Sequence, residues 1–178
     1  MLLPIALPDW LNPADPVTFA GDAEAMAYAV ALSRRNVAEG GGPFAALVVD
    51  AQGGLVAAGC NRVVAQGNSV LHAEMVAIML AQQKLGTHDL RRAGRLTLIT
   101  SCAPCAMCLG AIPWSGVSRV VCGARGEDAE AIGFDEGDKP AAWVEKLARR
   151  DIEVAENVGR EDAAAVLREY GAQQSEIY

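Results

Sequence analysis

The sequence lacks two features that would place it at a membrane or on a nucleic acid. No run approaches the ~18 consecutive apolar residues of a membrane-spanning helix, so we expect a soluble protein without a membrane partner. Positive charge is not in excess either, because 15 Lys and Arg face 22 Asp and Glu, for a net charge of −7. Such a chain repels a phosphate backbone, and we expect no nucleic-acid partner. Basic pairs do occur among acids, and we interpret them as solvated helix ends: Arg34-Arg35, Arg91-Arg92 and Arg149-Arg150.

A disulfide framework is also missing. The five cysteines are an odd number, and Cys102, Cys105 and Cys108 lie within seven positions, too close for ordinary pairing. This use of cysteine favours a reducing compartment, and we expect a cytoplasmic protein. The apolar N-terminus has no basic leader or small-residue cleavage site, and two prolines interrupt it. We therefore interpret residues 1–21 as a docked or frayed arm.

Helical and strand patterns alternate from residue 69 onward. This alternation predicts a three-layer α/β domain, with parallel strands in the middle and helices on both faces. The chain has no internal repeats, low-complexity tracts or linkers, so we expect one domain over residues 1–178. The expected helices cover 22–39, 69–86 with Ser69 as cap, 104–116 with Pro104 first, 127–132, 140–150 and 160–174; the expected strands cover 44–50, 55–63, 95–101, 117–125 and 152–158.

The cysteine cluster indicates a metal site. Cys105 and Cys108 stand three residues apart at the start of an expected helix, so both sulfurs project from one face. The unpaired N–H groups and the dipole of a helix start favour thiolate over thiol. His72, which begins another expected helix, is the best third ligand for zinc, because His88 lies in the loop "GTHDL" and fits an exposed turn. The sequence therefore predicts zinc bound by one histidine and two cysteines.

Such a ligand set leaves one position of the zinc tetrahedron open, which is typical of catalytic sites. Water can bind there with its pKa lowered to about 7, and Glu74, two residues after His72, is placed to move its proton. A closed zinc site or an iron–sulfur cluster remains an alternative, because Cys102, Cys60 or Cys122 offers a fourth sulfur. The carboxylate beside the histidine favours the open, catalytic site.

The motif "HAE" at 72–74, followed by "PCAMC" at 104–108, resembles the zinc-dependent cytidine-deaminase-like superfamily. The resemblance runs from about residue 22 to the C-terminus. It implies a three-layer α/β/α fold with a central five-stranded mixed sheet, one zinc ion per chain, a homodimer, and hydrolysis of a free purine base, guanine, to xanthine and ammonia. The segments that resemble the bacterial guanine deaminases are "GGPFAALVV" (41–49), "NRV" (61–63), "HAEMVAI" (72–78), "PCAMCLGAIPWSG" (104–116) and "EAIGFDEG" (130–137).

The same resemblance implies residue roles. Glu74 would carry a proton from water to the purine ring, and Glu136 would contact the substrate and assist departure of the amine. Asn61 would hydrogen-bond the base. The family usually has Glu before the Pro-Cys pair, whereas this chain has Ala103, so a polar contact near the helix start is missing. The remaining implied residues are His72, Cys105 and Cys108 as zinc ligands, and Phe44, Ala73 and Trp114 against the base.

Other interpretations stay open. Phe44 and Trp114 also fit ordinary core packing, and Glu136 fits a solvated charge in the acidic loop "FDEGD". A tRNA-editing adenosine deaminase shares the metal motifs but would need a basic surface. Cytosine, guanosine or an amino-triazine are alternative substrates, because small chemical differences shift pocket selectivity by only a few kcal/mol. From a different class, a zinc-stabilised structural or interaction module would also bind the metal.

Overall fold

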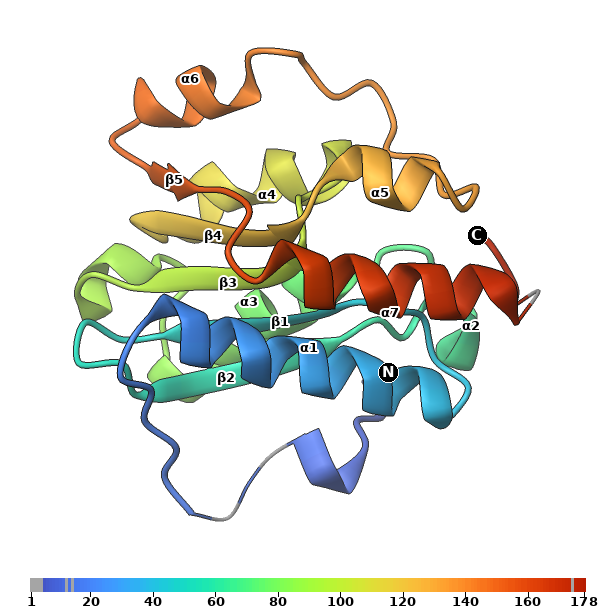
Figure 1. Cartoon of the computed structure of the whole chain (residues 1–178). Helices are drawn as coiled ribbons and strands as arrows, with labels where there is room; N and C mark the ends of the chain where they lie inside the picture. The colour runs from blue at the N-terminus through green and yellow to red at the C-terminus, as the bar shows by residue number, and fades with distance from the viewer. Residues whose placement is uncertain (1–4, 12, 14, 174) are drawn as a thin grey trace.

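The computed structural model folds the chain around a five-stranded mixed sheet with helices on both faces (Figure 1). Helices α1 (Asp22–Ala38) and α7 (Arg160–Ala172) cover one face, and α3 (Ala73–Leu85) and α4 (Ala106–Ser115) cover the other. This arrangement confirms the three-layer fold. The structure describes residues 5–11, 13, 15–173 and 175–178.

The strand order is β2-β1-β3-β4-β5, and the sheet is antiparallel in one half and parallel in the other. Strand β1 (Ala45–Val49) pairs antiparallel with β2 (Leu55–Cys60) and with β3 (Thr97–Cys102). Strands β3, β4 (Arg119–Ala124) and β5 (Glu153–Ala155) run parallel. The expected parallel strands are therefore confined to the second half of the chain, where helices connect them.

Each central strand is apolar throughout because both of its faces are covered. All five residues of β1 are buried. Successive side chains of a strand point to opposite faces, so the sheet contributes side chains to two hydrophobic cores, one on each face. Leu47, Ile99 and Val121 are register neighbours that pack toward α1 and α7, whereas Val48, Leu98 and Val120 are register neighbours that pack toward α3 and α4.

Several boundaries differ from the expectations, and three of these differences lie next to the candidate site. Strand β2 ends at Cys60, and a short helix α2 (Val63–Gln66) follows it. Ser69 does not cap α3, because the backbone N–H of Arg62 donates to the carbonyl of Leu71 and holds that segment in a turn; His72 is the N-cap. Helix α4 begins after Pro104, with Cys105 as its N-cap.

The remaining elements include two expected helices and two 3₁₀ turns that were not expected. They are α5 (Gly126–Glu130), α6 (Trp143–Ala148) and the 3₁₀ turns η1 (Asp9–Leu11) and η2 (Leu90–Ala93). The described part of the N-terminal arm is docked: Leu11 is fully buried, and the indole N–H of Trp10 donates to Glu39 at 2.6 Å. Residues 1–4, 12 and 14 of the expected arm, and residue 174 of the last expected helix, lie outside the described residues. Within the described chain, no helix is both long and apolar enough to cross a bilayer.

Candidate active site

Three metal-donor side chains converge where α3 and α4 begin. His72 caps α3 and Cys105 caps α4, and Cys108 lies in the first turn of α4. One donor atom from each of these residues lies within 4.8 Å of the others, and Cys105 Sγ is 3.5 Å from His72 Nδ1. Two ligands of a tetrahedral zinc ion, each ~2.0–2.3 Å from it, stand ~3.5–4 Å apart. The spacing and the soft donor set therefore fit zinc.

The charges of this cluster also suit a metal. The hydrogen bond from Cys108 lowers the pKa of Cys105 to about 4, with burial opposing it and His72 assisting. The pKa of the Cys108 thiol is raised, because that thiol donates to Cys105 and is buried. Burial opposes a charge on His72, but its contact with Cys105 gives a net rise in its pKa. The three groups thus share protons that a bound zinc ion would displace.

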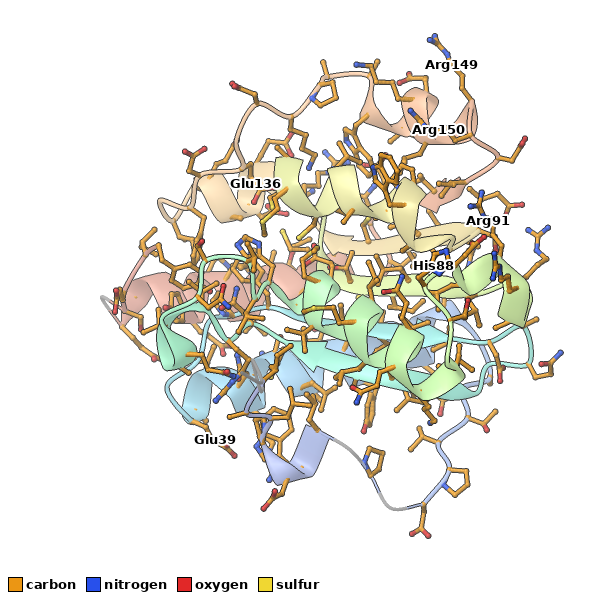
Figure 2. The ribbon with its side chains drawn as sticks, turned by 180° about the vertical axis from the view of Figure 1, so that it is seen from behind. Glu39, His88, Arg91, Glu136, Arg149 and Arg150 are labelled. Atoms are coloured by element: carbon orange, nitrogen blue, oxygen red, sulfur yellow. The ribbon has the colours of Figure 1, made fainter. Side chains whose placement is uncertain are left out.

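The other cysteines stay out of this cluster. The Cys102 thiol donates to the carbonyl of Arg125 at 3.3 Å, and Cys60 and Cys122 are buried as free thiols elsewhere in the core. Within residues 5–11, 13, 15–173 and 175–178, the metal-donor group contains His72, Cys105 and Cys108 alone. The donor set is therefore the three-ligand one. His88 is exposed after α3, and Figure 2 shows it beside Arg91, away from Glu136.

Glu74 lies in the first turn of α3 and is 7% exposed. It lines the same cavity as His72 and Cys105. Burial raises the pKa of this carboxyl, since the charged form loses its hydration. A buried carboxyl beside the metal-donor residues is placed to carry a proton to or from a group bound in the cavity.

The cavity above these groups has an aromatic wall. The rings of Phe44 and Phe134 meet edge to face with centroids 4.9 Å apart, and Tyr178 meets Phe134 in the same manner at 5.2 Å. All three line the cavity, whose free volume is about 30 Å³, near that of one water molecule. The hydroxyl of Tyr178 contacts the backbone at Gly42, so the end of the chain occupies part of this space.

Asn61, directly after β2, is 1% exposed and lines the cavity. Its Oδ1 accepts the backbone N–H of Val63 at 3.1 Å, while its Nδ2 has no partner in the described chain. The buried Asn36 donates to the carbonyls of Asn61 at 2.9 Å and Gly42 at 2.8 Å, which fixes this wall of the cavity. The free amide of Asn61 is therefore held ready to bond an acceptor on a ligand.

Glu136 lies in the loop between α5 and α6, yet it is only 8% exposed. Its carbonyl accepts the backbone N–H of Ala106 at 2.9 Å, which ties the loop to the start of α4. Figure 2 shows Glu136 in the region where the sulfur atoms gather. Burial raises the pKa of its carboxyl to about 7, and Lys139 opposes the rise. Glu136 is thus a buried group of the cavity and not a solvated loop charge.

The structure does not bring every expected residue to the cavity. Trp114 is 85% exposed on α4 and is not among the described residues that line this cavity, so its expected contact with the base stays a prediction. Ala73, which lies between His72 and Glu74 in the sequence, is fully buried, and its side chain packs into the core. Ala103 does line the cavity, to which its side chain offers a methyl group and no polar atom.

Sequence reasoning missed two members of the aromatic wall. Phe134 stands two residues before Glu136 in "GFDEG", and that proximity was the available signal. Tyr178 reaches the cavity from the far end of the chain, where no local pattern marks it.

Comparison with known proteins gives consistent matches. The zinc-binding region of cytidine and deoxycytidylate deaminases matches residues 20–124, which include all three metal-donor residues. A guanine deaminase of Bacillus subtilis is 41% identical over 120 residues, which are 64% of this chain and 74% of the relative. The solved structure of a guanine deaminase from Nitrosomonas europaea is 47% identical, with a TM-score of 0.93 over 96% of this chain and 97% of that one. The protein NE0047 in complex with 2,6-diaminopurine is 47% identical, with a TM-score of 0.95 over 99% and 96% of the two chains.

Proposed function

Because the chain belongs to the cytidine and deoxycytidylate deaminase family, we propose that it is a zinc-dependent aminohydrolase that converts guanine to xanthine and ammonia. One observation carries the proposal: two buried carboxyl groups, those of Glu74 and Glu136, line the same small cavity as the metal-donor cluster. Hydrolytic deamination needs one proton carrier for the attacking water and one for the leaving amine. The cavity supplies both.

His72, Cys105 and Cys108 would hold the zinc ion, which when bound supplies a Lewis acid that makes water a better nucleophile. Glu74 takes a proton from the attacking water and delivers it to the purine ring. The water oxygen then stands on C2 together with the amine. Glu136 donates a proton to that amine, the C–N bond breaks, and ammonia leaves. The Glu136 carboxylate takes back the hydroxyl proton as the new carbonyl forms, so one guanine and one water give one xanthine and one ammonia and both carboxyl groups return to their starting states.

The remaining cavity residues bind and orient the base. A purine needs more room than the cavity has with Tyr178 in it, so Tyr178 must move aside for the base to enter. The amide Nδ2 of Asn61 then donates a hydrogen bond to a purine acceptor, and the rings of Phe44 and Phe134 pack against the purine. Ala73 contributes through its backbone, because the first N–H groups of a helix have no intrahelical acceptor. With the side chain of Trp114 outside the cavity, recognition rests on the two phenylalanine rings and Asn61.

A deamination panel tests the substrate. Purified protein with one equivalent of zinc is incubated with guanine, adenine, cytosine, guanosine and tRNA, and ammonia release is measured. We expect guanine to be turned over fastest. Faster turnover of tRNA or cytosine would overturn the assignment within the family, and zinc binding without ammonia release from any of them would point to a structural zinc module.

We propose in addition that two copies form a homodimer through the outer face of α4. Trp114 is 85% exposed and Met107, seven residues earlier, is 36% exposed, so both lie on one helix face. A large exposed aromatic of this kind is typical of a surface that another chain covers.

We also propose that the chain forms one domain and that the protein is cytoplasmic. The five free thiols support a reducing compartment.

A further inference from the structure

The carboxylate of Glu136 stands between two cavities. Together with Ala103, it lines both the small cavity with the metal-donor residues and a second, larger cavity of about 520 Å³. The larger cavity is polar and open, with exposed acids such as Glu127, Glu130 and Glu156 on its walls. For Glu136 to protonate an amine, one of its carboxyl oxygens must stay directed to the small cavity while the other is fixed on the side of the large one, whose walls also include Lys139 and Trp143.

Lys139 is placed to hold it. The distance from Lys139 Nζ to Glu136 Oε2 is 3.7 Å, and the two side chains are only 14% and 9% exposed. The ammonium also lies over the ring of Trp143, 5.0 Å from the centroid, so an aromatic face fixes it from another side. The start of α5 closes the arrangement: a methyl group on Gly126 would lie 3.3 Å from Glu136 Oε2 and 3.4 Å from Lys139 Nζ. Three chain segments thus confine this ion pair.

The charges around Glu136 make the ion pair with Lys139 the main contact that fixes its carboxylate. Glu136 Oε2 is buried and accepts no hydrogen bond from any described residue, so its charge depends on an ion pair. The one described cation within 4.0 Å of it is Lys139. The nearby Arg125 is engaged elsewhere, with its Nε donating to Asn157 at 2.6 Å. The acids of the large cavity repel the carboxylate, so they oppose an outward turn but cannot anchor it.

From this geometry we propose that Lys139 is a positioning residue. Its ammonium, which lies over the ring of Trp143, holds Oε2 of Glu136 on the side of the large cavity and leaves the other carboxyl oxygen to serve the departing amine. The proposal rests on the function proposed above. It assigns to Lys139 no contact with the substrate. Its loss therefore affects the turnover step and leaves binding of the base and of zinc intact.

The test replaces Lys139 by Met, which keeps the length and removes the charge, and by Arg, which keeps the charge. Misplacing a catalytic group by ~1 Å can cost ~10²-fold in rate, so we expect Lys139→Met to lower kcat for guanine at least about tenfold. KM should stay within about threefold and zinc at one per chain, and Lys139→Arg should recover most of the rate. The matched control is Lys146→Met, the same change at an exposed position of α6, which should leave kcat unchanged.

A double-mutant cycle tests the positioning role of Lys139 separately from the proposed role of Glu136 in guanine deamination. Glu136→Gln alone should lower kcat strongly, and adding Lys139→Met should then change kcat less than about twofold, because the group that Lys139 positions is gone. If Glu136→Gln retains full activity, Glu136 is not the amine's acid and the proposed chemistry fails. If Glu136→Gln is impaired while Lys139→Met matches wild type, or if the two losses multiply, the positioning role is overturned alone. Should Lys139→Met not fold, Lys139→Gln takes its place in the cycle.

Discussion

The sulfur atom of Cys105 lies 3.5 Å from Nδ1 of His72, although 33 residues separate them in the sequence. The contact exists because each residue is the N-cap of a helix, and α3 and α4 begin at the same end of the sheet. A cap residue stands at a fixed point of the fold, since the helix behind it and the segment before it are both packed. The backbone thus fixes the relative positions of His72 and Cys105, so their side chains need little rearrangement to meet.

The first prediction concerns this metal site. Cys105→Ser should lose zinc and activity together, because an alcohol does not replace the thiolate of Cys105 as a ligand of zinc. Zinc per chain is measured by mass spectrometry of the purified protein. Cys102→Ser is the control and should retain zinc, since the Cys102 thiol bonds the Arg125 carbonyl instead. A Cys105→Ser protein with a full complement of zinc would disprove the assignment.

A second prediction concerns Asn61. Asn61→Ala removes an amide that is buried in the cavity with an unused donor, so KM for guanine should rise by about two- to tenfold, as expected for one hydrogen bond of ~0.5–1.5 kcal/mol. The zinc content should not change. Steady-state kinetics with wild type and variant measure the effect. An unchanged KM would mean that the Nδ2 atom does not meet the base.

Local chemistry explains what the sequence could predict of the site. His72, Glu74, Cys105 and Cys108 belong to two short motifs at helix starts, and the spacing within each motif marks these side chains as candidates for one metal site. The metal-donor residues and the fold class therefore follow from the sequence. Ser69 was a plausible cap by residue type, but a turn that joins Arg62 to Leu71 moves the helix start to His72.

Long-range packing explains what the sequence could not predict. The type of an aromatic residue does not indicate whether its side chain faces a pocket or solvent. The sequence therefore could not predict that Trp114 is exposed. Phe134 and Tyr178 reach the cavity through a loop and a chain end, where no periodicity fixes the direction of a side chain. The burial of Glu136 likewise depends on the start of α4, to which the loop is bonded.

The third prediction tests the outer face of α4. Trp114→Glu places a charge in the proposed subunit contact, so it should convert a dimer to a monomer. Size-exclusion chromatography with light scattering measures the mass. Ala27→Glu, the same charge on exposed α1 at the opposite face of the sheet, should leave the mass unchanged. If Trp114→Glu keeps the mass of the wild-type dimer, the contact lies elsewhere.

The last prediction concerns stability in acid. Asp22, the first residue of α1, accepts two hydrogen bonds from the Arg119 guanidinium, at 2.7 and 2.5 Å. These bonds lower the pKa of Asp22, against a smaller effect of burial. A carboxyl whose pKa is lower in the folded state stabilises the fold at pH values above its unfolded pKa of ~3.9, and the stabilisation is lost as pH falls through the folded value. Because both side chains are about one-third exposed, we expect a contribution of at most ~1 kcal/mol at pH 7.

Asp22→Asn should therefore lower Tm by about 2–4 °C at pH 7, the shift that ~1 kcal/mol gives in a domain of this size. The difference from wild type should shrink as the pH is lowered below ~3.9, because the wild-type carboxyl is then protonated as well. Thermal unfolding followed by circular dichroism at several pH values measures both effects. Glu145→Gln, which neutralises an exposed carboxyl on α6, should show no such dependence. A Tm difference for Asp22→Asn that is the same at pH 7 and at pH ~2 would mean that the side chain acts through packing and not through its charge.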